Sequence, residues 1–515
     1  MSVARVASRA QLGLHAPRVE VEVHLGGGLP NFSIVGLPAT AVKESKDRVR
    51  AALANSGFEW PAGRITVNLS PADLPKEGCR YDLPIALGIL LASAQISMPQ
   101  QRLENSEFYG ELGLAGELRP IKGVLLAAAH AAREHRGLIV PVANLGEARI
   151  AASRSDGADS LLGVCAIARV DQRDCLADNL PCLPMSASGV SGPDLADVRG
   201  QAAAKRALII AAAGGHSLLF VGPPGTGKSM LAQRMPGLLP PLAADEALDV
   251  AAIASVSSRG FTPTDFGRRP FRSPHHTASA SAIIGGGPQS RPGEVSLAHR
   301  GVLFLDELPE FNRSVLESLR EPLESGVVAI SRAARQVEYP ARFQLIAAMN
   351  PCPCGYLGEP TGNCRCSPPE IARYRARISG PLLDRIDLRV PVPAVSSEEL
   401  LDEVVAEPRL SSASAAEQVR AARDRQLARA GMMNAELAGR ELQQHCPLDR
   451  SARLLLGQLR TKFELSARGV HRVIRVARTI ADLQDPGVHA AGSALTAAHL
   501  AEALQLRRAL NPGNS

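Results

Sequence analysis

Nearly continuous runs of apolar residues recur through the middle of the chain. They occupy residues 218–221, 301–305, 343–349 and 388–392. A strand of a parallel sheet is covered on both faces, so its sequence is apolar at successive rather than alternate positions. An amphipathic helix pattern follows the first run after a glycine-rich loop. The pattern predicts an α/β core with a buried sheet over residues 194–395, opened by a helix over 194–213.

The first 170 residues show a mixed pattern. Residues 19–25 alternate between apolar and polar positions, and three glycines at 26–28 interrupt the alternation, as at the end of a half-buried strand. Further strands are expected at 32–36, 64–69 and 138–141, the last as a closing strand, and helices at 39–56, 84–93 and 124–133. This order predicts an α+β domain with its own core over residues 1–170.

Helical periodicity dominates the end of the chain. Ser396 and Glu399 have the spacing of a capping box. Further helices are expected at 415–430, 448–462, 469–483 and 496–509, so residues 396–515 are predicted to form a helical lid domain. Proline, serine and glycine gather in residues 180–193. A linker is therefore expected at 171–193, between the first domain and the core.

Composition narrows the class of protein. The chain has 515 residues, of which 45% are hydrophobic and 21% are charged, and such a chain is expected to form several globular domains. Its net charge of +6 is compatible with polyanions, but with only 3% aromatic residues any nucleic-acid contact would rest on Arg and Lys. The N-terminal sequence lacks a signal-peptide pattern, the longest apolar run is too short to cross a bilayer, and the nine cysteines form no secreted pattern. A cytoplasmic protein without a membrane partner is expected.

The strongest motif follows the run at 218–221. It consists of Gly222, Pro223, Pro224, Gly225, Thr226, Gly227, Lys228 and Ser229. These residues match G-x-x-x-x-G-K-[ST] between a predicted strand and a predicted helix, where the glycines let the backbone N–H groups surround phosphates. Lys228 would reach the β- and γ-phosphates and the Ser229 hydroxyl would bind Mg²⁺. The motif predicts a nucleoside triphosphate site.

Two carboxylates follow the apolar run at 301–305, and an arginine precedes the run at 388–392. Asp306 is expected to hold the Mg²⁺ shell and Glu307 to polarise the attacking water. Arg385 lies just before the run at 388–392. An arginine displaced from its own nucleotide site suggests a finger that completes the site of a neighbouring subunit. The alternative is a surface ion pair of Arg385 with Asp384 or Asp387.

The order of motifs resembles a known branch of AAA+ ATPases. The phosphate loop is followed by FRSPHHTASASAIIGGG, RPGEVSLAHRGVLFLDELPEF, LIAAMNPCPCG and GPLLDRIDL, which is similar to the magnesium-chelatase branch. With the first domain included, nearly the whole chain resembles the ComM/YifB family. The resemblance implies a hexameric, ATP-driven DNA helicase that promotes branch migration during natural transformation, acting on single-stranded, duplex or branched DNA. Metal insertion into a porphyrin is not implied, because the chelatase partners and a metal-binding extension are absent from the sequence.

The same resemblance assigns further residues. Asn350 would sense the γ-phosphate of ATP and position water. In the helical lid, Arg468 is the candidate sensor of bound nucleotide, with Arg472 as its rival. Residues 326–342 contain two alternating runs around Arg332 and Arg335, which predicts a hairpin with a basic tip.

The basic residues of the chain have two interpretations, contact with DNA or exposure to solvent. In this branch of ATPases such a hairpin projects into the ring pore, where Arg332 and Arg335 would bind DNA phosphates. A solvated hairpin end explains their charges equally well. Residues 283–294 resemble a second insertion that faces the pore, with Arg291 as its basic contact. A basic stretch also contains Arg420, Arg423, Arg425 and Arg429, for which a solvated helix face is favoured over DNA contact.

Two segments of the first domain, 69–90 and 110–148, resemble the proteolytic domain of Lon-type proteases, which has a ribosomal S5-like fold. The position of the family's catalytic serine holds Arg80, and that of its lysine holds Leu125. Without a hydroxyl nucleophile and an amine base, peptidase chemistry is not expected. Cys79 is interpreted as a buried spectator thiol.

Four of the cysteines lie close together in sequence. Cys352, Cys354, Cys364 and Cys366 form a C-x-C…C-x-C pattern, which is adequate for a tetrahedral Zn²⁺ site although C-x₂-C is the usual pair. Zinc and free thiols are equally favoured. The adjacent His275 and His276 are interpreted as structural.

Two rival functions remain at this point. One is an ATP-switched chaperone or chelatase-type metal-insertion subunit that acts on a protein partner. The other is an ATP-dependent peptidase, against which Arg80 and Leu125 argue. Stimulation of ATP hydrolysis by DNA would distinguish a DNA motor from both.

Overall fold

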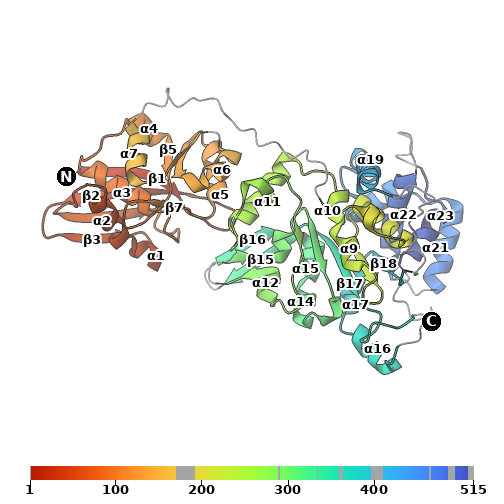
Figure 1. The fold of residues 1–515 in the computed structure, drawn as a ribbon. Coiled ribbons are helices and arrows are strands. Elements are labelled where there is room, and N and C mark those ends of the chain that lie inside the picture. Colours follow the sequence, from red (N-terminus) through yellow and green to blue (C-terminus); the bar gives the residue numbers. More distant parts are fainter. Residues whose placement is uncertain are drawn as a thin grey trace. The chain divides into compact units, whose positions relative to one another are not determined.

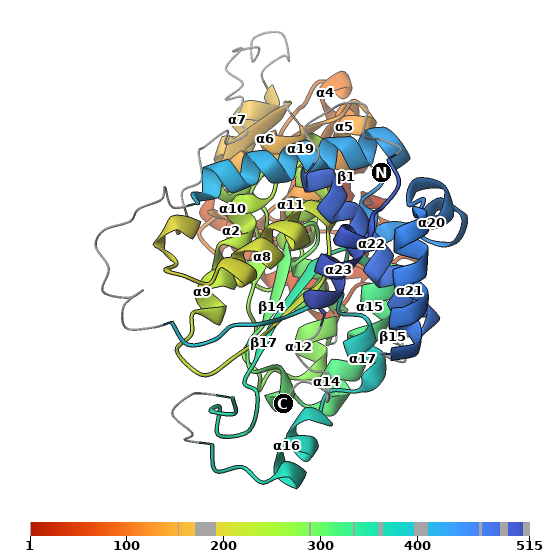
Figure 2. The same ribbon diagram turned by 90° about the vertical axis from the view of Figure 1, so that its right-hand side faces the viewer.

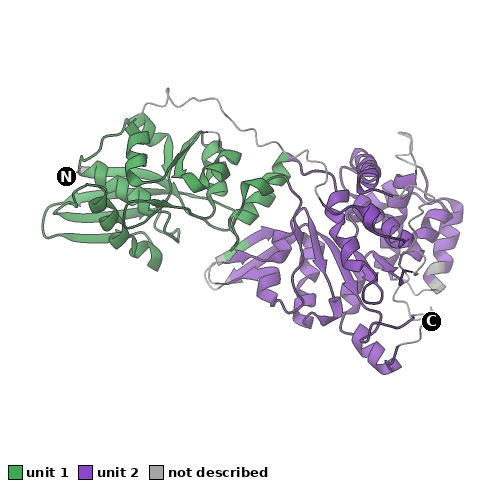
Figure 3. Cartoon of the chain, viewed as in Figure 1, with its two compact units in different colours: residues 1–186, 244–267, 333–337 green, residues 187–243, 268–332, 338–515 purple. Residues whose placement is uncertain are grey.

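The computed structural model describes residues 2–152, 154–169, 192–287, 290–332, 335–358, 364–395, 410–462, 466–484 and 493–507. They form two compact units, shown in Figure 3: unit 1 takes residues 1–186, 244–267 and 333–337, and unit 2 takes 187–243, 268–332 and 338–515. The sequence predicted domains that follow one another along the chain, whereas unit 1 also contains two segments of the predicted core, 244–267 and 333–337. The expected core and lid share unit 2 because sheet residues such as Leu218 and lid residues such as Ile480 belong to one hydrophobic core.

A four-stranded sheet organises the first part of unit 1. Its order is β1 (Ser2–Arg9), β2 (Arg18–Gly26), β4 (Arg64–Ser70) and β3 (Asn31–Val35). The first three strands pair antiparallel, and β3 pairs parallel with β4. The buried helix α3 (Asp82–Ala92) packs on β1 and β2, and α2 (Ser45–Asn55) packs on α3. Gly88 allows α3 to approach the sheet, because a Cβ there would lie 2.5 Å from Val23.

The second part of unit 1 is built on a three-stranded parallel sheet. Its order is β5 (Ser106–Phe108), β8 (Gly137–Pro141) and β9 (Ser155–Ala158). The strand expected at 138–141 is confirmed as β8, but it does not close the domain, because β9 follows it in the chain and pairs with it. The third strand was missed because its sequence, SDGA, has no apolar run. Smaller elements complete this part of the unit: α1 (Thr40–Lys43), α4 (Gln100–Glu104), β6 (Glu111–Leu112), β7 (Leu118–Arg119), α5 (Val124–Arg133), α6 (Val142–Ala151) and α7 (Leu161–Arg169).

A helix from the expected ATPase core also belongs to unit 1. The helix α11 (Ala244–Ser255) packs against α5, and the 3₁₀ turn η2 (Pro263–Asp265) packs against α6. At the end of α11 the Ser255 hydroxyl donates to the buried carboxylate of Glu147 at 2.5 Å. Glu147 also accepts from the backbone N–H of Leu125, so this carboxylate links α11 to the start of α5.

Unit 2 contains a five-stranded parallel sheet (Figure 1). Its order is β11 (Phe271–Arg272), β14 (Val302–Leu305), β17 (Gln344–Met349), β10 (Leu218–Val221) and β18 (Leu388–Pro391). The strands expected at 218–221, 301–305, 343–349 and 388–392 are confirmed within a residue or two. Because β14, β17 and β10 are neighbours, the segments that follow their carboxyl ends meet at one edge of the sheet.

The prediction of one continuous helix at the start of unit 2 is wrong. In place of a helix over 194–213, the 3₁₀ turn η1 (Leu195–Asp197) is separated from α8 (Ala202–Gly214). Gly200 and Gln201 both have positive φ, which ends helical geometry between the two. This break places the Gln201 amide beside the phosphate loop, where it donates to the Thr226 carbonyl at 3.4 Å and to the Pro393 carbonyl at 2.6 Å.

Short helices and two hairpins fill the rest of the core. They are α9 (Lys228–Gln233), α10 (Met235–Leu238), α12 (Ala280–Ile284), β12 (Gly285–Gly286), β13 (Arg291–Pro292), α13 (Glu294–Leu297), η3 (Leu308–Glu310), α14 (Arg313–Ser318), α15 (Arg320–Ser325), β15 (Val327–Arg332), β16 (Arg335–Pro340), α16 (Pro368–Arg375) and α17 (Gly380–Asp384). The strands β12 and β13 pair, and so do β15 and β16, which confirms the expected hairpin within 326–342.

The C-terminal part of unit 2 is helical, as expected. It comprises α19 (Ser412–Ala430), η4 (Asn434–Glu436), α20 (Gly439–His445), α21 (Arg450–Lys462), α22 (Ala467–Gln484) and α23 (Ala497–Gln505). The helix α23 packs against both α21 and α22 (Figure 2). The expected capping box at Ser396 and Glu399 lies outside the described residues. In the part of the chain that the structure describes, no helix is long and apolar enough to cross a membrane.

The basic stretch of α19 is mostly not a solvated face, which corrects the expectation. Arg423 donates to the Ala212 carbonyl at the end of α8, and Arg425 donates to the Asp482 carbonyl of α22. Arg429 is only 3% exposed and pairs with the Asp482 carboxylate at 2.7 Å. The fourth arginine, Arg420, is exposed. Three of the four arginines therefore join α19 to its neighbours, and Arg420 is the one that is exposed.

Asp482 is the centre of this buried network. Its carboxylate is 1% exposed and accepts hydrogen bonds from Arg429, Arg478 and Asn434. Replacing Asp482 with asparagine is expected to lower the free energy of unfolding by about 3–5 kcal/mol, because two buried guanidinium groups would lose their counter-charge. The urea midpoint of unfolding would measure this loss. Asp424→Asn, at an exposed position of α19, is the control, and equal midpoints for both variants would contradict a stabilising network.

Candidate nucleotide-binding site

The phosphate loop joins β10 to α9, which begins at Lys228. Gly225 and Gly227 have φ values of +78° and +88°, which favour glycine, and no atom lies within 4 Å of the place where a Cβ would be. The loop is therefore open at these positions, as binding of a phosphate group against the backbone requires. The geometry fits a nucleoside triphosphate.

Lys228 lies inside the loop. Its side chain donates to the carbonyls of Gly222 and Pro223 at 2.7 and 2.6 Å and to the Asn350 side-chain oxygen at 3.3 Å. Burial lowers the pKa of Lys228, while the charges of Asp306 and Glu307 act in the opposite direction. The structure thus brings the expected phosphate ligand and the expected γ-phosphate sensor together across β10 and β17.

Ser229 and Asp306 also meet. The Ser229 hydroxyl donates to the Asp306 carboxylate at 2.6 Å, and the other oxygen of Asp306 accepts from the backbone N–H of Glu307 at 2.9 Å. A hydroxyl beside a carboxylate is the kind of oxygen pair that binds Mg²⁺ together with substrate phosphates. Bound there, Mg²⁺ would neutralise charge on the β- and γ-phosphates.

Glu307 has an unusual backbone conformation. Its φ is +53°, in the left-handed region that residues other than glycine seldom adopt. Its carboxylate is half exposed and lies 3.1 Å from Nδ1 of His276. Such strain is often found at functional sites, and here the tight turn after β14 places the carboxylate beside the histidine.

His276 is the residue of the site that sequence reasoning missed. Both histidines were expected to be structural, but His276 contacts Glu307 and its ring lies 4.1 Å from that of His275. Only the position of the pair in the segment that resembles the chelatase branch could have signalled this. We therefore add His276 to the site as the partner of Glu307.

Arg385 ends α17 and is held within unit 2. Its guanidinium forms an ion pair with Glu324 and donates to the Pro381 carbonyl at 2.8 Å. Neither Asp384 nor Asp387, the ion-pair partners considered from the sequence, is the partner that the structure gives it. The hydrogen bond from Arg385 lowers the pKa of Glu324.

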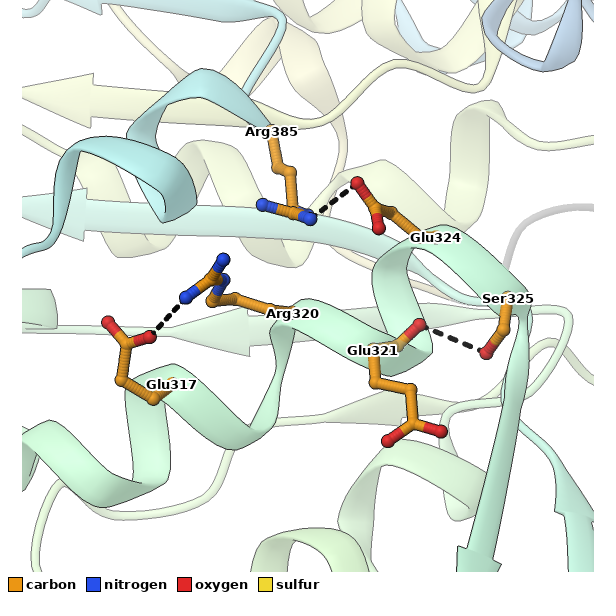
Figure 4. Close-up of a pocket in the computed structure, with 6 residues that line it drawn as sticks. All are labelled: Glu317, Arg320, Glu321, Glu324, Ser325 and Arg385. Carbon is orange, nitrogen blue, oxygen red and sulfur yellow. Dashed lines mark hydrogen bonds and ion pairs between the residues drawn. The ribbon is translucent and has the colours of Figure 1, made fainter.

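Arg385 faces an open surface pocket of about 370 Å³ (Figure 4). The pocket is lined by Glu317, Arg320, Glu321, Glu324, Ser325 and Arg385. Figure 4 shows Arg385 pointing toward Glu324 and Arg320 toward Glu317. The ion pair of Arg320 with Glu317 measures 2.7 Å. The side chain of Arg385 is only 8% exposed, and it lines a charged surface pocket together with Glu324 and Arg320.

The two candidate sensors in α22 differ in their contacts. Arg472 donates to Asp387 at 2.6 Å and to the Arg385 carbonyl at 2.9 Å. Arg468, one turn earlier, is exposed, and its charge helps to lower the pKa of Glu324, after the larger contribution of Arg385. Arg472 therefore supports the Arg385 segment, and Arg468 remains the candidate sensor.

The candidate DNA residues are only partly described. Arg332 and Arg335 end β15 and begin β16, but their side chains lie outside the described residues. The half-buried Arg291 lies in β13. The Tyr339 hydroxyl of β16 donates to the Ser290 carbonyl at 2.9 Å. The hairpin and the insertion at 283–294 therefore lie against each other.

The four clustered cysteines converge. Their sulfur atoms all lie within 4.8 Å of one another. The distances from Cys352 Sγ are 3.4 Å to Cys354 and 3.7 Å to Cys364, and Cys354 lies 3.7 Å from Cys364. Such a set of thiols could hold a tetrahedral metal ion.

In unit 1, the positions that correspond to the catalytic serine and lysine of Lon-type proteases hold Arg80 and Leu125, which provide neither a nucleophile nor a base. Arg80 is 7% exposed and donates to the Gln11 side chain at 2.7 Å and to the Lys122 carbonyl at 2.9 Å. Leu125 is 1% exposed. Burial raises the pKa of the Cys79 thiol to about 11, and a thiol is a good nucleophile only as the thiolate. Cys79 is thus unsuited to nucleophilic attack near neutral pH.

Known protein families match most of the chain. The model described as "Magnesium chelatase, subunit ChlI" matches residues 194–400. "Subunit ChlI of Mg-chelatase" matches residues 21–144, and "Magnesium chelatase, subunit ChlI C-terminal" matches residues 409–507. All three models therefore come from one group of proteins and follow one another along the chain.

Full-length relatives narrow the assignment. The "Competence protein ComM" of Haemophilus influenzae is 48% identical over 512 residues, which cover 98% of both chains. The protein YifB of Escherichia coli is 47% identical over 511 residues, or 98% of this chain and 97% of the relative. A "Magnesium-chelatase 38 kDa subunit" of Rhodobacter capsulatus is 26% identical over 36% of this chain and 55% of its own length. The chain belongs to the ComM/YifB family of magnesium-chelatase-like AAA+ proteins.

Proposed function

We propose that this protein is a Mg²⁺-dependent ATPase whose hexameric ring moves DNA and promotes branch migration while incoming DNA recombines during natural transformation. The observation that carries the ATPase part is the assembled set of Lys228, Ser229, Asp306 and Asn350. The competence part is supported by the name of the Haemophilus influenzae relative, which is 48% identical over 98% of both chains.

Each residue has a chemical task in this proposal. Lys228 binds the β- and γ-phosphates, and Ser229 and Asp306 hold Mg²⁺. Glu307 accepts a proton from the attacking water, while His276 orients its carboxylate. Asn350 positions that water, and Arg385 of one subunit approaches the γ-phosphate bound by the next. The pocket-facing position of Arg385 supports its role in a neighbouring site.

DNA contact is assigned to the β15–β16 hairpin and the insertion packed beside it. Arg332 is the last residue of β15, Arg335 is the first residue of β16, and Arg291 belongs to the insertion. Arginine side chains of this kind bind phosphates without regard to sequence, and salt weakens the contact. A motor that migrates a branch point needs contacts of this sequence-independent type.

Measuring ATP turnover with and without four-way-junction DNA tests whether ATP hydrolysis is coupled to DNA binding. We expect DNA to stimulate hydrolysis, and the stimulation to fall as salt rises. The double variant Arg332→Ala/Arg335→Ala should lose most of the stimulation while keeping its basal rate. Arg420→Ala, at an exposed arginine of the lid helix α19, is the matched control and should behave as wild type.

A rate that is indifferent to single-stranded, duplex and branched DNA would contradict the motor. It would favour the alternative, an ATP-switched chaperone or metal-insertion subunit acting on a protein partner. The chelatase-subunit names of the three matching models support that alternative. The relative from Haemophilus influenzae, which covers 98% of the chain, is named a competence protein, and this supports the competence part of the proposal.

A further inference from the structure

The four cysteines lie in the loop that follows the γ-phosphate sensor. We infer that Cys352, Cys354, Cys364 and Cys366 bind one Zn²⁺ ion, and that this ion holds the loop after Asn350 against the phosphate loop. The metal site is inferred only from the positions of the four cysteine sulfur atoms. Its effect on hydrolysis rests on the proposed function.

Sulfur distances match a tetrahedral zinc site. Four thiolates at a Zn–S distance of about 2.3 Å in tetrahedral geometry lie about 3.8 Å apart. The sulfur–sulfur distances among Cys352, Cys354 and Cys364 are 3.4, 3.7 and 3.7 Å, and the sulfur of Cys366 lies within 4.8 Å of all three. A disulfide would bring two sulfurs to about 2.05 Å, and all four cysteines are free.

The surroundings of the sulfur atoms also suit a metal. Backbone N–H groups of Tyr356 and Arg365 donate to the Cys354 sulfur, and such hydrogen bonds orient and stabilise metal-bound ligands. Cys352 is fully buried, while the other three are partly exposed. An ion could therefore reach the site from solvent past the three partly exposed cysteines, while the buried Cys352 would shield it on the protein side.

Without a metal, little would hold this loop. Among its described residues, 350–358 and 364–367, none belongs to a helix or a strand. Thiols are weak hydrogen-bond donors and acceptors, so four converging thiols add little stability. A shared zinc ion would supply strong bonds across the loop, which explains why the four side chains point to one place.

The loop is in contact with the ATP site at two points. Gly355 has a φ of +90°, and a Cβ there would lie 2.8 Å from Pro224 of the phosphate loop and 3.8 Å from Asn350. After the last cysteine, α16 returns to the sensor, where Arg375 donates to the Pro351 carbonyl at 3.3 Å. The cluster therefore closes a loop whose two ends meet at Asn350. Fixing the loop would fix the sensor relative to Lys228.

Metal analysis of the purified full-length protein tests the site. We expect about one zinc per chain in wild type and in the control Cys79→Ser, whose thiol lies outside the cluster, and almost none in Cys364→Ser/Cys366→Ser. Exchange of zinc for Co²⁺ should give the visible bands of tetrahedral cobalt thiolate. Protein purified from zinc-supplemented cells that contains no zinc, or that contains iron and sulfide instead, would overturn the proposal.

The effect of the zinc site on ATP hydrolysis is tested by a separate measurement. Loss of zinc in Cys364→Ser/Cys366→Ser should lower kcat by about tenfold, the scale typical of outer-shell changes, with a smaller change in ADP affinity, because Asn350 acts on the γ-phosphate. A zinc-free variant with the wild-type kcat would overturn the link between metal and sensor. Both measurements work without DNA, so failure of the DNA-motor proposal leaves them unaffected.

Discussion

Replacing Glu307 with glutamine is expected to slow ATP turnover by about 10²- to 10⁴-fold, the usual contribution of a positioned general base. Glutamine has nearly the same shape but cannot accept a proton from water. Lys228, Ser229 and Asp306 remain in place, so ATP affinity should change little. Single-turnover hydrolysis and equilibrium binding of a fluorescent ATP analogue, measured on the same preparation, separate the two effects.

Glu310→Gln is the matched control for this variant. Glu310 lies one turn further along, in η3, and pairs with Arg377 at the surface. It should hydrolyse ATP at the wild-type rate, because exposed ion pairs contribute little. A Glu307→Gln protein that turns over ATP as fast as this control would exclude Glu307 as the base. Loss of ATP binding would instead show that Glu307 supports the site itself.

Arg385→Ala is expected to reduce ATP turnover by about 10³- to 10⁵-fold, the range known for arginine fingers. Because Arg385 acts on the neighbour's nucleotide, ATP binding to the variant's own site should persist. Mixing Arg385→Ala with Glu307→Gln protein should restore part of the activity. In a mixed ring, some sites receive an intact glutamate from one subunit and an intact arginine from the next.

Arg320→Ala controls for the pocket in which Arg385 lies. Arg320 lines the same surface and pairs with Glu317 (Figure 4), but it has no assigned role in hydrolysis. Its replacement should leave turnover within about twofold of wild type, as for most surface positions. Stable mixed rings of Arg385→Ala and Glu307→Gln that recover no hydrolysis would contradict action across a subunit boundary.

The elements predictable from sequence were those with a strong local pattern. The buried strand at 218–221 and the loop ending in Lys228 and Ser229 are recognisable without any tertiary contact. The strand β10 has the expected bounds, and the helix expected after the loop begins at Lys228. Asp306 is predictable because it follows a buried strand, whereas the role of Asn350 comes from the resemblance to AAA+ ATPases. In the structure, neighbouring parallel strands bring both residues to one edge of the sheet.

What the sequence could not supply were contacts between distant segments. The helix pattern of 244–255 says nothing of its packing on α5 in unit 1. Likewise the ring of His276 meets Glu307 only because β11 and β14 are adjacent strands. The arginines of α19 look like a solvated face until their partners on α8 and α22 are known. Composition and periodicity describe an element, whereas its partners are decided by the packing of the whole unit.

ATP-driven branch migration of a synthetic four-way junction tests the central claim most directly. Wild-type protein with ATP and Mg²⁺ is expected to convert the junction into two duplexes. Glu307→Gln should bind the same DNA and fail to convert it, and wild type with ADP should also fail. If wild type hydrolyses ATP rapidly on junction DNA and leaves the junction intact, the protein is an ATPase that does not migrate DNA branches.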